Sequence, residues 1–189
     1  MSNAAWQSLV AQTADRPGVA CPMFHLDLDA QPTEVRHART FLRAQLSGYP
    51  QLPLDLILLL ASELVTNAML HGRTSIGLDV SVHPGVIPAQ GPGQPGAAAG
   101  PSVLVGVTDA SPAVPRQRPR SRSKEGGRGL QIVRELADEW GWLPLDDTGG
   151  KIVWFRVHAG VADPSQRPVR KRSLPRKPAG AVDGEPASG

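Results

Sequence analysis

Polar and apolar residues alternate with period two in parts of this chain, which is the pattern of half-buried β-strands. Residues 23–28 (MFHLDL) and residues 76–82 both alternate in this way. Residues 103–107 (VLVGV) are continuously apolar, as in a strand that is covered on both faces. We expect the strands at residues 76–82 and 103–107 to pair with each other.

Three other segments carry apolar residues at helical spacing. One begins at Pro32, which suits the first turn of a helix, and ends at Gly48. A second begins at Pro53 and ends near Gly72, a residue type that commonly caps the C-terminus of a helix. A third apolar stripe covers residues 129–138. These segments predict helices between the strands.

The end of the apolar pattern predicts a closing hairpin. Residues 140–145 and 151–158 lie on either side of a Gly-containing turn. The predicted order is therefore strand, helix, helix, strand, strand, helix, strand, strand, within one domain over residues 23–158. A chain of 189 residues with 40% hydrophobic content is long enough for one sizeable core.

Four stretches lack the periodicity of a packed element. Residues 84–101 are dominated by Gly, Pro and Ala, which predicts a flexible insertion in a hairpin. Residues 110–127 contain three prolines and five basic residues, and we expect a lid there. Residues 1–22 are predicted to be a flexible tail, and residues 159–189 a disordered, basic, Pro-rich tail.

Charge and cysteine content restrict the possible functions. Residues 1–160 hold 14 basic and 14 acidic side chains, so the formal net charge of +3 comes from the residues beyond them. This balance argues against a broad nucleic-acid-binding face, and we expect no direct nucleic-acid contact. Cys21 is the single cysteine, which fits a reducing, cytoplasmic setting. The longest apolar run has six residues, against the ~20 that a membrane span needs, so we expect no membrane segment.

Polar residues stand at three junctions of this pattern. On the second predicted helix, Glu63, Asn67 and His71 recur every four residues, within about 80° of one face. Asp109 follows the apolar strand, where its carboxylate would emerge at the edge of the sheet. Residues 126–130 (GGRGL) form a Gly-rich turn into a helix, where backbone N–H groups and the helix dipole favour phosphate. Each feature alone also fits a solvated helix face, a capped turn or a flexible turn, so the functional hypothesis depends on their combination.

The combination resembles a known family. In order, ELVTNAMLHG, VTDASP, GGRGLQIV and GGKIVWF resemble the N box, the two glycine boxes and the terminal hairpin of the Bergerat ATPases. The resemblance covers roughly residues 23–158 and is strongest to the stand-alone anti-sigma regulatory factors, which are serine/threonine protein kinases. It implies an α/β (α+β) sandwich with a mixed sheet, helices on one face of that sheet and an ATP lid.

The resemblance also implies a role for each matching residue. Glu63 would be catalytic and would orient or deprotonate the attacking hydroxyl or water, and Asn67 would help to hold Mg²⁺. Asp109 would accept a proton of the adenine amino group in a hydrogen bond. The remaining residues implied to contact ATP are His71, Ser111, Gly127, Arg128, Gly129 and Leu130.

The implied function is an ATP- and Mg-dependent kinase that phosphorylates an anti-anti-sigma protein and sequesters a sigma factor. A homodimer is compatible with this function. The alternative is an ATP-binding switch that regulates a partner protein without phosphate transfer. The chain departs from the usual first glycine box, because Ala110, Ser111 and Pro112 follow Asp109 where the family has glycines.

Other chemistries have no support in the sequence. The Gly-Lys pair at residues 150 and 151 precedes Ile152, where a P-loop needs Ser or Thr. The sequence contains no HExxH motif, nucleophile elbow or protein-kinase catalytic loop. His37 lacks the helix pair that a histidine-kinase phosphoacceptor would need.

Overall fold

The computed structural model describes residues 4–14, 19–72, 76–85, 100–113, 115, 129–145 and 149–160, without the side chains of residues 71 and 72. Helices and strands follow each other in an order that matches the predicted one, with one additional helix at the start. The elements are α1 (Ala4–Thr13), β1 (Met23–Leu28), α2 (Glu34–Leu46), α3 (Leu54–Gly72), β2 (Ile76–His83), β3 (Ser102–Asp109), α4 (Gly129–Leu136), β4 (Glu139–Pro144) and β5 (Lys151–His158).

The described strands form a five-stranded sheet in the order β1-β2-β3-β5-β4, and every neighbouring pair is antiparallel. The predicted pairing of the strands at residues 76–82 and 103–107 and the closing hairpin are both confirmed. The expectation of a mixed sheet is wrong. A single helix between neighbouring strands would return the chain parallel, whereas the two helices α2 and α3 reverse it twice and bring β2 back antiparallel to β1.

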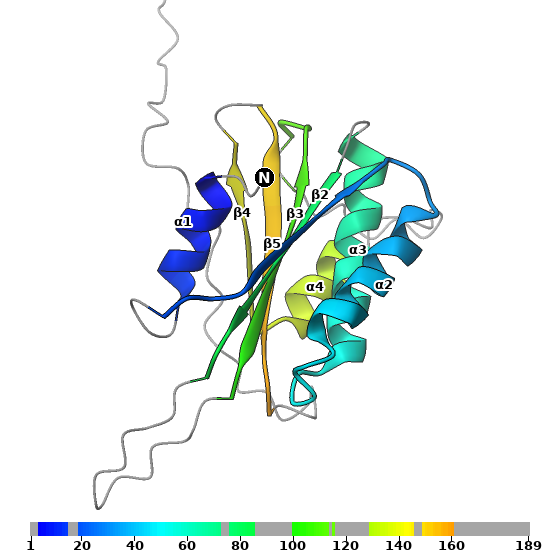
Figure 1. Ribbon diagram of the computed structural model, residues 1–189. Helices are drawn as coiled ribbons and strands as arrows, with labels where there is room; N and C mark the ends of the chain where they lie inside the picture. Colours follow the sequence, from blue (N-terminus) through cyan, green and yellow to red (C-terminus); the bar gives the residue numbers. More distant parts are fainter. Residues whose placement is uncertain are drawn as a thin grey trace, which may run out of the picture.

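Helices α2, α3 and α4 lie together on one face of the sheet (Figure 1). The alternating positions of the central strands that point to these helices are apolar and buried, among them Leu78, Val80, Val105 and Phe155. Burying one such side chain contributes roughly 1.5–3 kcal/mol before conformational entropy is subtracted. The main core therefore lies between this face and the three helices.

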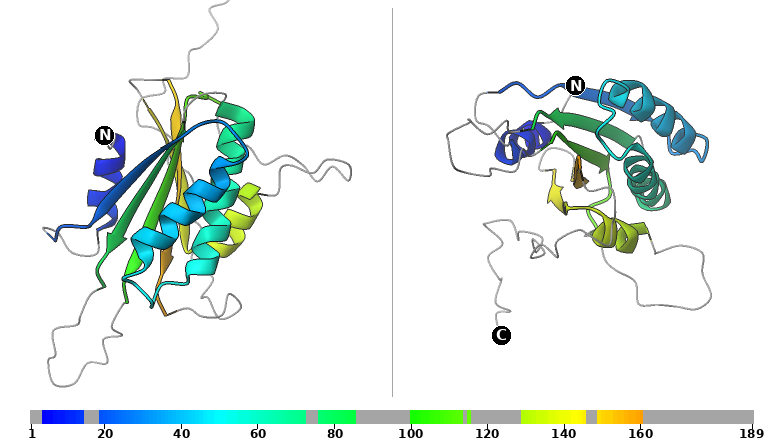
Figure 2. Two further views of the ribbon diagram at one scale, coloured as in Figure 1. Left: turned by 45° about the vertical axis from the view of Figure 1, so that its right-hand side comes forward. Right: turned by 90° about the horizontal axis from the view of Figure 1, so that it is seen from below.

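Helix α1 covers part of the opposite face, as the view along the sheet in Figure 2 shows. Trp6 is fully buried and packs in a second apolar cluster with Leu104 and Ile152. Gly106 lets the indole approach, since a Cβ added there would lie 2.5 Å from Cζ3 of Trp6.

This packing corrects two expectations: the predicted flexible tail over residues 1–22 contains a packed helix at Ala4–Thr13, and helices do not lie on one face alone. Trp6, Leu9 and Val10 have the i, i+3, i+4 spacing of an apolar helix stripe, and all three are buried. The stripe is short because α1 has 10 residues, so it gives a weak periodic signal.

Several predicted segments lie largely outside the described residues. These are most of the insertion at 84–101, most of the lid at 110–127 and nearly all of the tail at 159–189. Among the helices that are described, none is both long and apolar enough to cross a membrane.

Candidate functional site

Glu63 and Asn67 lie on α3, one helical turn apart, and both side chains are partly buried. The rest of α3 is strongly apolar, and its Leu58, Ala61 and Val65 are fully buried in the main core. The burial of that face fixes the rotation of the helix, so the two polar side chains lie together at its border. Neither makes a hydrogen bond to a described residue, which leaves their polar atoms available.

Gly129, the first residue of α4, lies directly against this polar pair. A Cβ added at Gly129 would come within 2.5 Å of Oε2 of Glu63 and 3.0 Å of Nδ2 of Asn67. Real Cβ atoms do not approach other atoms so closely, so any side chain at position 129 would force the carboxylate of Glu63 to move, and glycine leaves the polar pair in place. The structure thus brings the predicted N box and the end of the predicted second glycine box into contact.

Leu130 has a structural role through its side chain, which packs against the main core. Any contact that it makes with phosphate would therefore come from its backbone N–H at the start of α4. Gly127 and Arg128 lie outside the described residues, and so does the side chain of His71, although its backbone belongs to α3.

Asp109 is the last residue of β3, and its carboxylate is 5% exposed. It follows Val105 and Val107 at alternate positions, so it lies on the sheet face that α3 and α4 cover. Its Oδ1 accepts a hydrogen bond from the backbone N–H of Ser111 at 2.8 Å. This bond closes a local turn just after the strand.

Lys151 lies beside Asp109, although no sequence motif indicated it. It is paired with Asp109 across β3 and β5, and its Nζ lies 2.7 Å from Oδ1 of Asp109. The same ammonium donates a hydrogen bond to the backbone carbonyl of Ser111 at 3.0 Å. The missing information was the strand register, because Asp109 and Lys151 are 42 positions apart in the sequence and meet only when β3 pairs with β5.

Gly150 supports this second group of residues. A Cβ at Gly150 would overlap the backbone carbonyl oxygen of Asp109, so the turn into β5 can approach the end of β3 only with glycine there. Glycine at this position therefore allows Lys151 to reach the carboxylate.

The described residues therefore form two polar groups on the helix-bearing side of the sheet. Glu63 and Asn67 meet the start of α4, and Asp109 meets Ser111 and Lys151 at the end of β3. No set of three or more His, Cys, Asp or Glu side chains in the described ranges could hold a metal ion. A cation at Asn67 would therefore depend on oxygen atoms of a ligand such as phosphate.

Comparison with known proteins identifies the matching family by its sequence model. The histidine kinase-like ATPase domain matches residues 28–157, a range that contains every residue of both polar groups. Among curated proteins, none matches the chain. A crystal structure of the RsbU and RsbW domains of Rv1364c from Mycobacterium tuberculosis is similar at 21% sequence identity and a TM-score of 0.45. The similarity covers 71% of this chain and 32% of that one.

Proposed function

This chain belongs to the histidine kinase-like ATPase domain family, and we propose that it is a serine/threonine protein kinase of the anti-sigma type. Membership in a family of ATPase domains implies that the chain binds ATP. The proposed kinase phosphorylates an anti-anti-sigma protein and sequesters a sigma factor. The observation that supports it most is the contact of Gly129 with Glu63 and Asn67, which joins a carboxylate to a helix start suited to phosphate.

Glu63 has the properties of a general base. Its carboxylate is partly buried and makes no hydrogen bond to a described residue, so it can accept the proton of an incoming hydroxyl group. A positioned general base contributes roughly 10²- to 10⁴-fold to a rate. In the proposed reaction, the serine or threonine hydroxyl of the partner gives its proton to Glu63 while its oxygen bonds to the γ-phosphorus of ATP. The bond from that phosphorus to the β–γ bridging oxygen breaks, and ADP leaves with the electron pair.

Asn67 fits a magnesium ion through its side-chain amide oxygen. Mg²⁺ prefers oxygen ligands and takes the remaining ones from phosphates and water, where it neutralises charge on the transferred group. Asn67 would hold the ion beside the helix start, and Asp109 with Ser111 would hold the adenine. Backbone N–H groups of residues 127–130 and the side chain of His71 would complete the contacts to phosphate.

The second candidate is an ATP-binding switch that regulates a partner without phosphate transfer. The two candidates share the nucleotide contacts and differ in their need for Glu63. A carboxylate on the partly buried border of α3 is not required to bind an anionic ligand, so its presence favours transfer.

The test is phosphate transfer from γ-labelled ATP to candidate anti-anti-sigma proteins. We expect Glu63→Ala to bind Mg-ATP almost normally and to transfer phosphate ~10²- to 10⁴-fold more slowly. Asn67→Ala should lose Mg-dependent ATP affinity together with transfer. Glu135→Ala is the matched control, because Glu135 is an exposed glutamate on α4 that accepts a hydrogen bond from Gln131 on the same helix.

Each outcome separates the candidates. Tight ATP binding by the wild type without label on any partner would favour the switch. A folded wild type that binds no ATP would contradict both candidates.

A further inference from the structure

Lys151 and Asp109 form an ion pair that is almost completely buried, with side chains 7% and 5% exposed. Removing two charges from water is costly, and the attraction between them does not generally exceed the gain from apolar residues of the same volume. The neighbouring positions of β5, Ile152 and Val153, are apolar and buried. Apolar residues at both positions 109 and 151 would therefore serve the fold at least as well, so the buried pair calls for another explanation.

The hydrogen bonds of the pair leave one donor and one acceptor without a partner in the described part of the chain. Oδ1 of Asp109 accepts from Nζ of Lys151 and from the backbone N–H of Ser111. Oδ2 of Asp109 has no such partner. An ammonium has three N–H donors, and Lys151 uses one for Asp109 and one for the Ser111 carbonyl.

The open acceptor and the open donor belong to two groups that are bonded to each other, so they lie side by side. The base of ATP presents the complementary pair on one edge, where the 6-amino group donates and the adjacent ring nitrogen N1 accepts. Proteins commonly recognise a base by hydrogen bonds to this edge. A charged donor makes such a bond stronger than a neutral one would.

We propose that Lys151 is a specificity-determining residue that donates a hydrogen bond to N1 of adenine while Asp109 accepts one from the 6-amino group. This proposal rests on the proposed function, in which Asp109 faces the base of ATP. It adds a direct protein donor to the base contacts. It also gives Lys151 a second effect, because its bond to the Ser111 carbonyl holds the turn that follows Asp109.

The experiment compares the affinities of ATP and 1-deaza-ATP, in which N1 is replaced by a C–H group. Loss of a hydrogen bond to a charged donor should weaken binding to the wild type by ~10- to 100-fold. In Lys151→Met the two nucleotides should bind with equal affinity. The control ligand is 7-deaza-ATP, which changes a different edge of the base. The ratio of its affinity to that of ATP should be the same for the wild type and for Lys151→Met.

Lys151→Met leaves Asp109 as an unpaired buried charge, so circular dichroism must first show that the variant is folded. Lys151→Gln keeps a neutral donor at nearly the same length and should show an intermediate 1-deaza effect. The wild-type comparison needs no variant at all, and equal binding of ATP and 1-deaza-ATP by the wild type would overturn the proposal.

Two further outcomes are distinct. An equal loss for 1-deaza-ATP in the wild type and in folded Lys151→Met would also overturn the proposal, because N1 would then be bound by another donor. Absence of ATP binding by the folded wild type would instead contradict the proposed function itself.

Discussion

The two faces of the sheet use the same five strands but bury different kinds of residue. On β2, Leu78 and Val80 face the three helices and join the main core, whereas Asp79, Ser81 and His83 face the other way. All of these side chains are buried. The difference therefore lies in the chemistry of the buried groups and not in the amount of burial.

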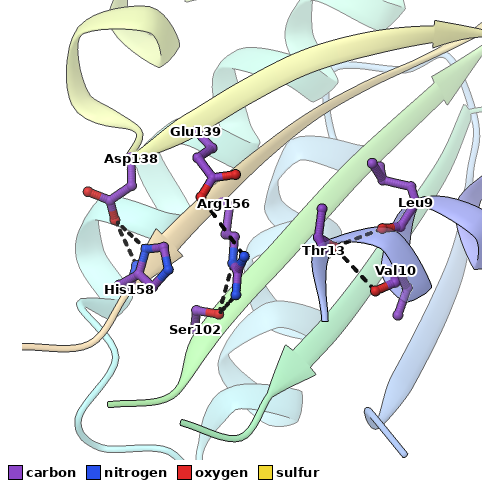
Figure 3. Close-up of polar contacts among 8 residues, drawn as sticks. All are labelled: Leu9, Val10, Thr13, Ser102, Asp138, Glu139, Arg156 and His158. Carbon is purple, nitrogen blue, oxygen red and sulfur yellow. Dashed lines mark hydrogen bonds and ion pairs between the residues drawn. The ribbon is translucent and has the colours of Figure 1, made fainter. Parts of the chain in front are cut away.

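On the face away from the three helices, charged groups are paired between neighbouring strands or with a nearby turn. Figure 3 shows Arg156 bound to Ser102 and close to Glu139, and His158 bound to Asp138. The carboxylate of Asp79 is bound in the same manner, 2.9 Å from Nδ1 of His25.

On the helix-bearing side, by contrast, the side chains of Glu63 and Asn67 are partly buried and make no hydrogen bond to a described residue. A polar group that is held in place but left with hydrogen-bonding capacity is available to a ligand, whereas a paired one stabilises the fold. The side chains of Glu63 and Asn67, unpaired among the described residues, therefore support the proposed site on the helix-bearing side, and the ion pairs of the opposite face suit a structural role.

The largest expected effect on this comparison comes from Trp6→Ala. Truncating a fully buried Trp typically costs about 3–5 kcal/mol, so the free energy of unfolding in urea should fall by that amount. The affinity for ATP should stay within about twofold of wild type, since α1 lies on the opposite face. Ser8→Ala on the exposed side of α1 is the control and should change stability by less than about 0.5 kcal/mol. An unchanged unfolding free energy in Trp6→Ala would show that α1 is not docked.

A second test exchanges one buried aspartate on each face for asparagine. Asp109→Asn replaces a charged acceptor by a neutral amide, and ATP affinity should fall by ~10- to 100-fold in calorimetry. Asp79→Asn makes the same chemical change on the opposite face and should leave ATP affinity unchanged. Equal affinities of both variants and the wild type would remove Asp109 from the base contacts.

A third test places a methyl group at one close contact on each face. In Gly129→Ala the added Cβ meets the flexible end of Glu63, so stability should change little. A displacement of about 1 Å in a reacting group can slow a reaction by ~10²-fold, so the rate of phosphate transfer should fall by up to ~10²-fold. In Gly106→Ala the added Cβ meets the indole of Trp6, and we expect a loss of about 1–3 kcal/mol in stability with normal transfer. Normal transfer by Gly129→Ala together with slow transfer by Gly106→Ala would contradict the placement of the site on the helix-bearing side.

The sequence predicted most of the elements because their periodicity is long and regular. The strand at residues 23–28 and the helix that begins after Pro53 both have this property, and both are observed. Helix α1 was missed because its apolar stripe is short. Whether neighbouring strands run parallel or antiparallel also depends on which strands become neighbours in the sheet, and a local pattern does not contain the order β1-β2-β3-β5-β4.

In the candidate site, too, local sequence motifs identified some residues, and the one that depends on strand pairing was not identified. Sequence motifs identified Glu63, Asn67 and Asp109, because these positions match a family pattern. Lys151 was not identified, since its importance depends on the register between β3 and β5. Its position as the first residue of the last strand, just after Gly150, was the available signal. The assignments to Gly127 and Arg128 stay predictions, since these residues lie outside the described ranges.

The smallest expected effect is a pH dependence of the unfolding free energy, which tests whether burial of Asp79 raises its pKa. Burial raises the pKa of Asp79 above its ordinary value of 3.8, and the hydrogen bond and charge of His25 oppose this rise in part. A carboxyl group with a raised pKa binds its proton more tightly in the folded state, so its contribution to stability is greatest below pH 3.8 and decreases as the pH rises through the folded-state pKa.

The difference in unfolding free energy between the wild type and Asp79→Asn should therefore decrease between pH 3.8 and the folded-state pKa, by at most about 1.4 kcal/mol per pH unit, and become constant above that pKa. Urea denaturation of both proteins at a series of pH values measures this difference. A difference that increases with pH would show that the pairing of Asp79 with His25, which also contacts Asp27, outweighs the cost of burial.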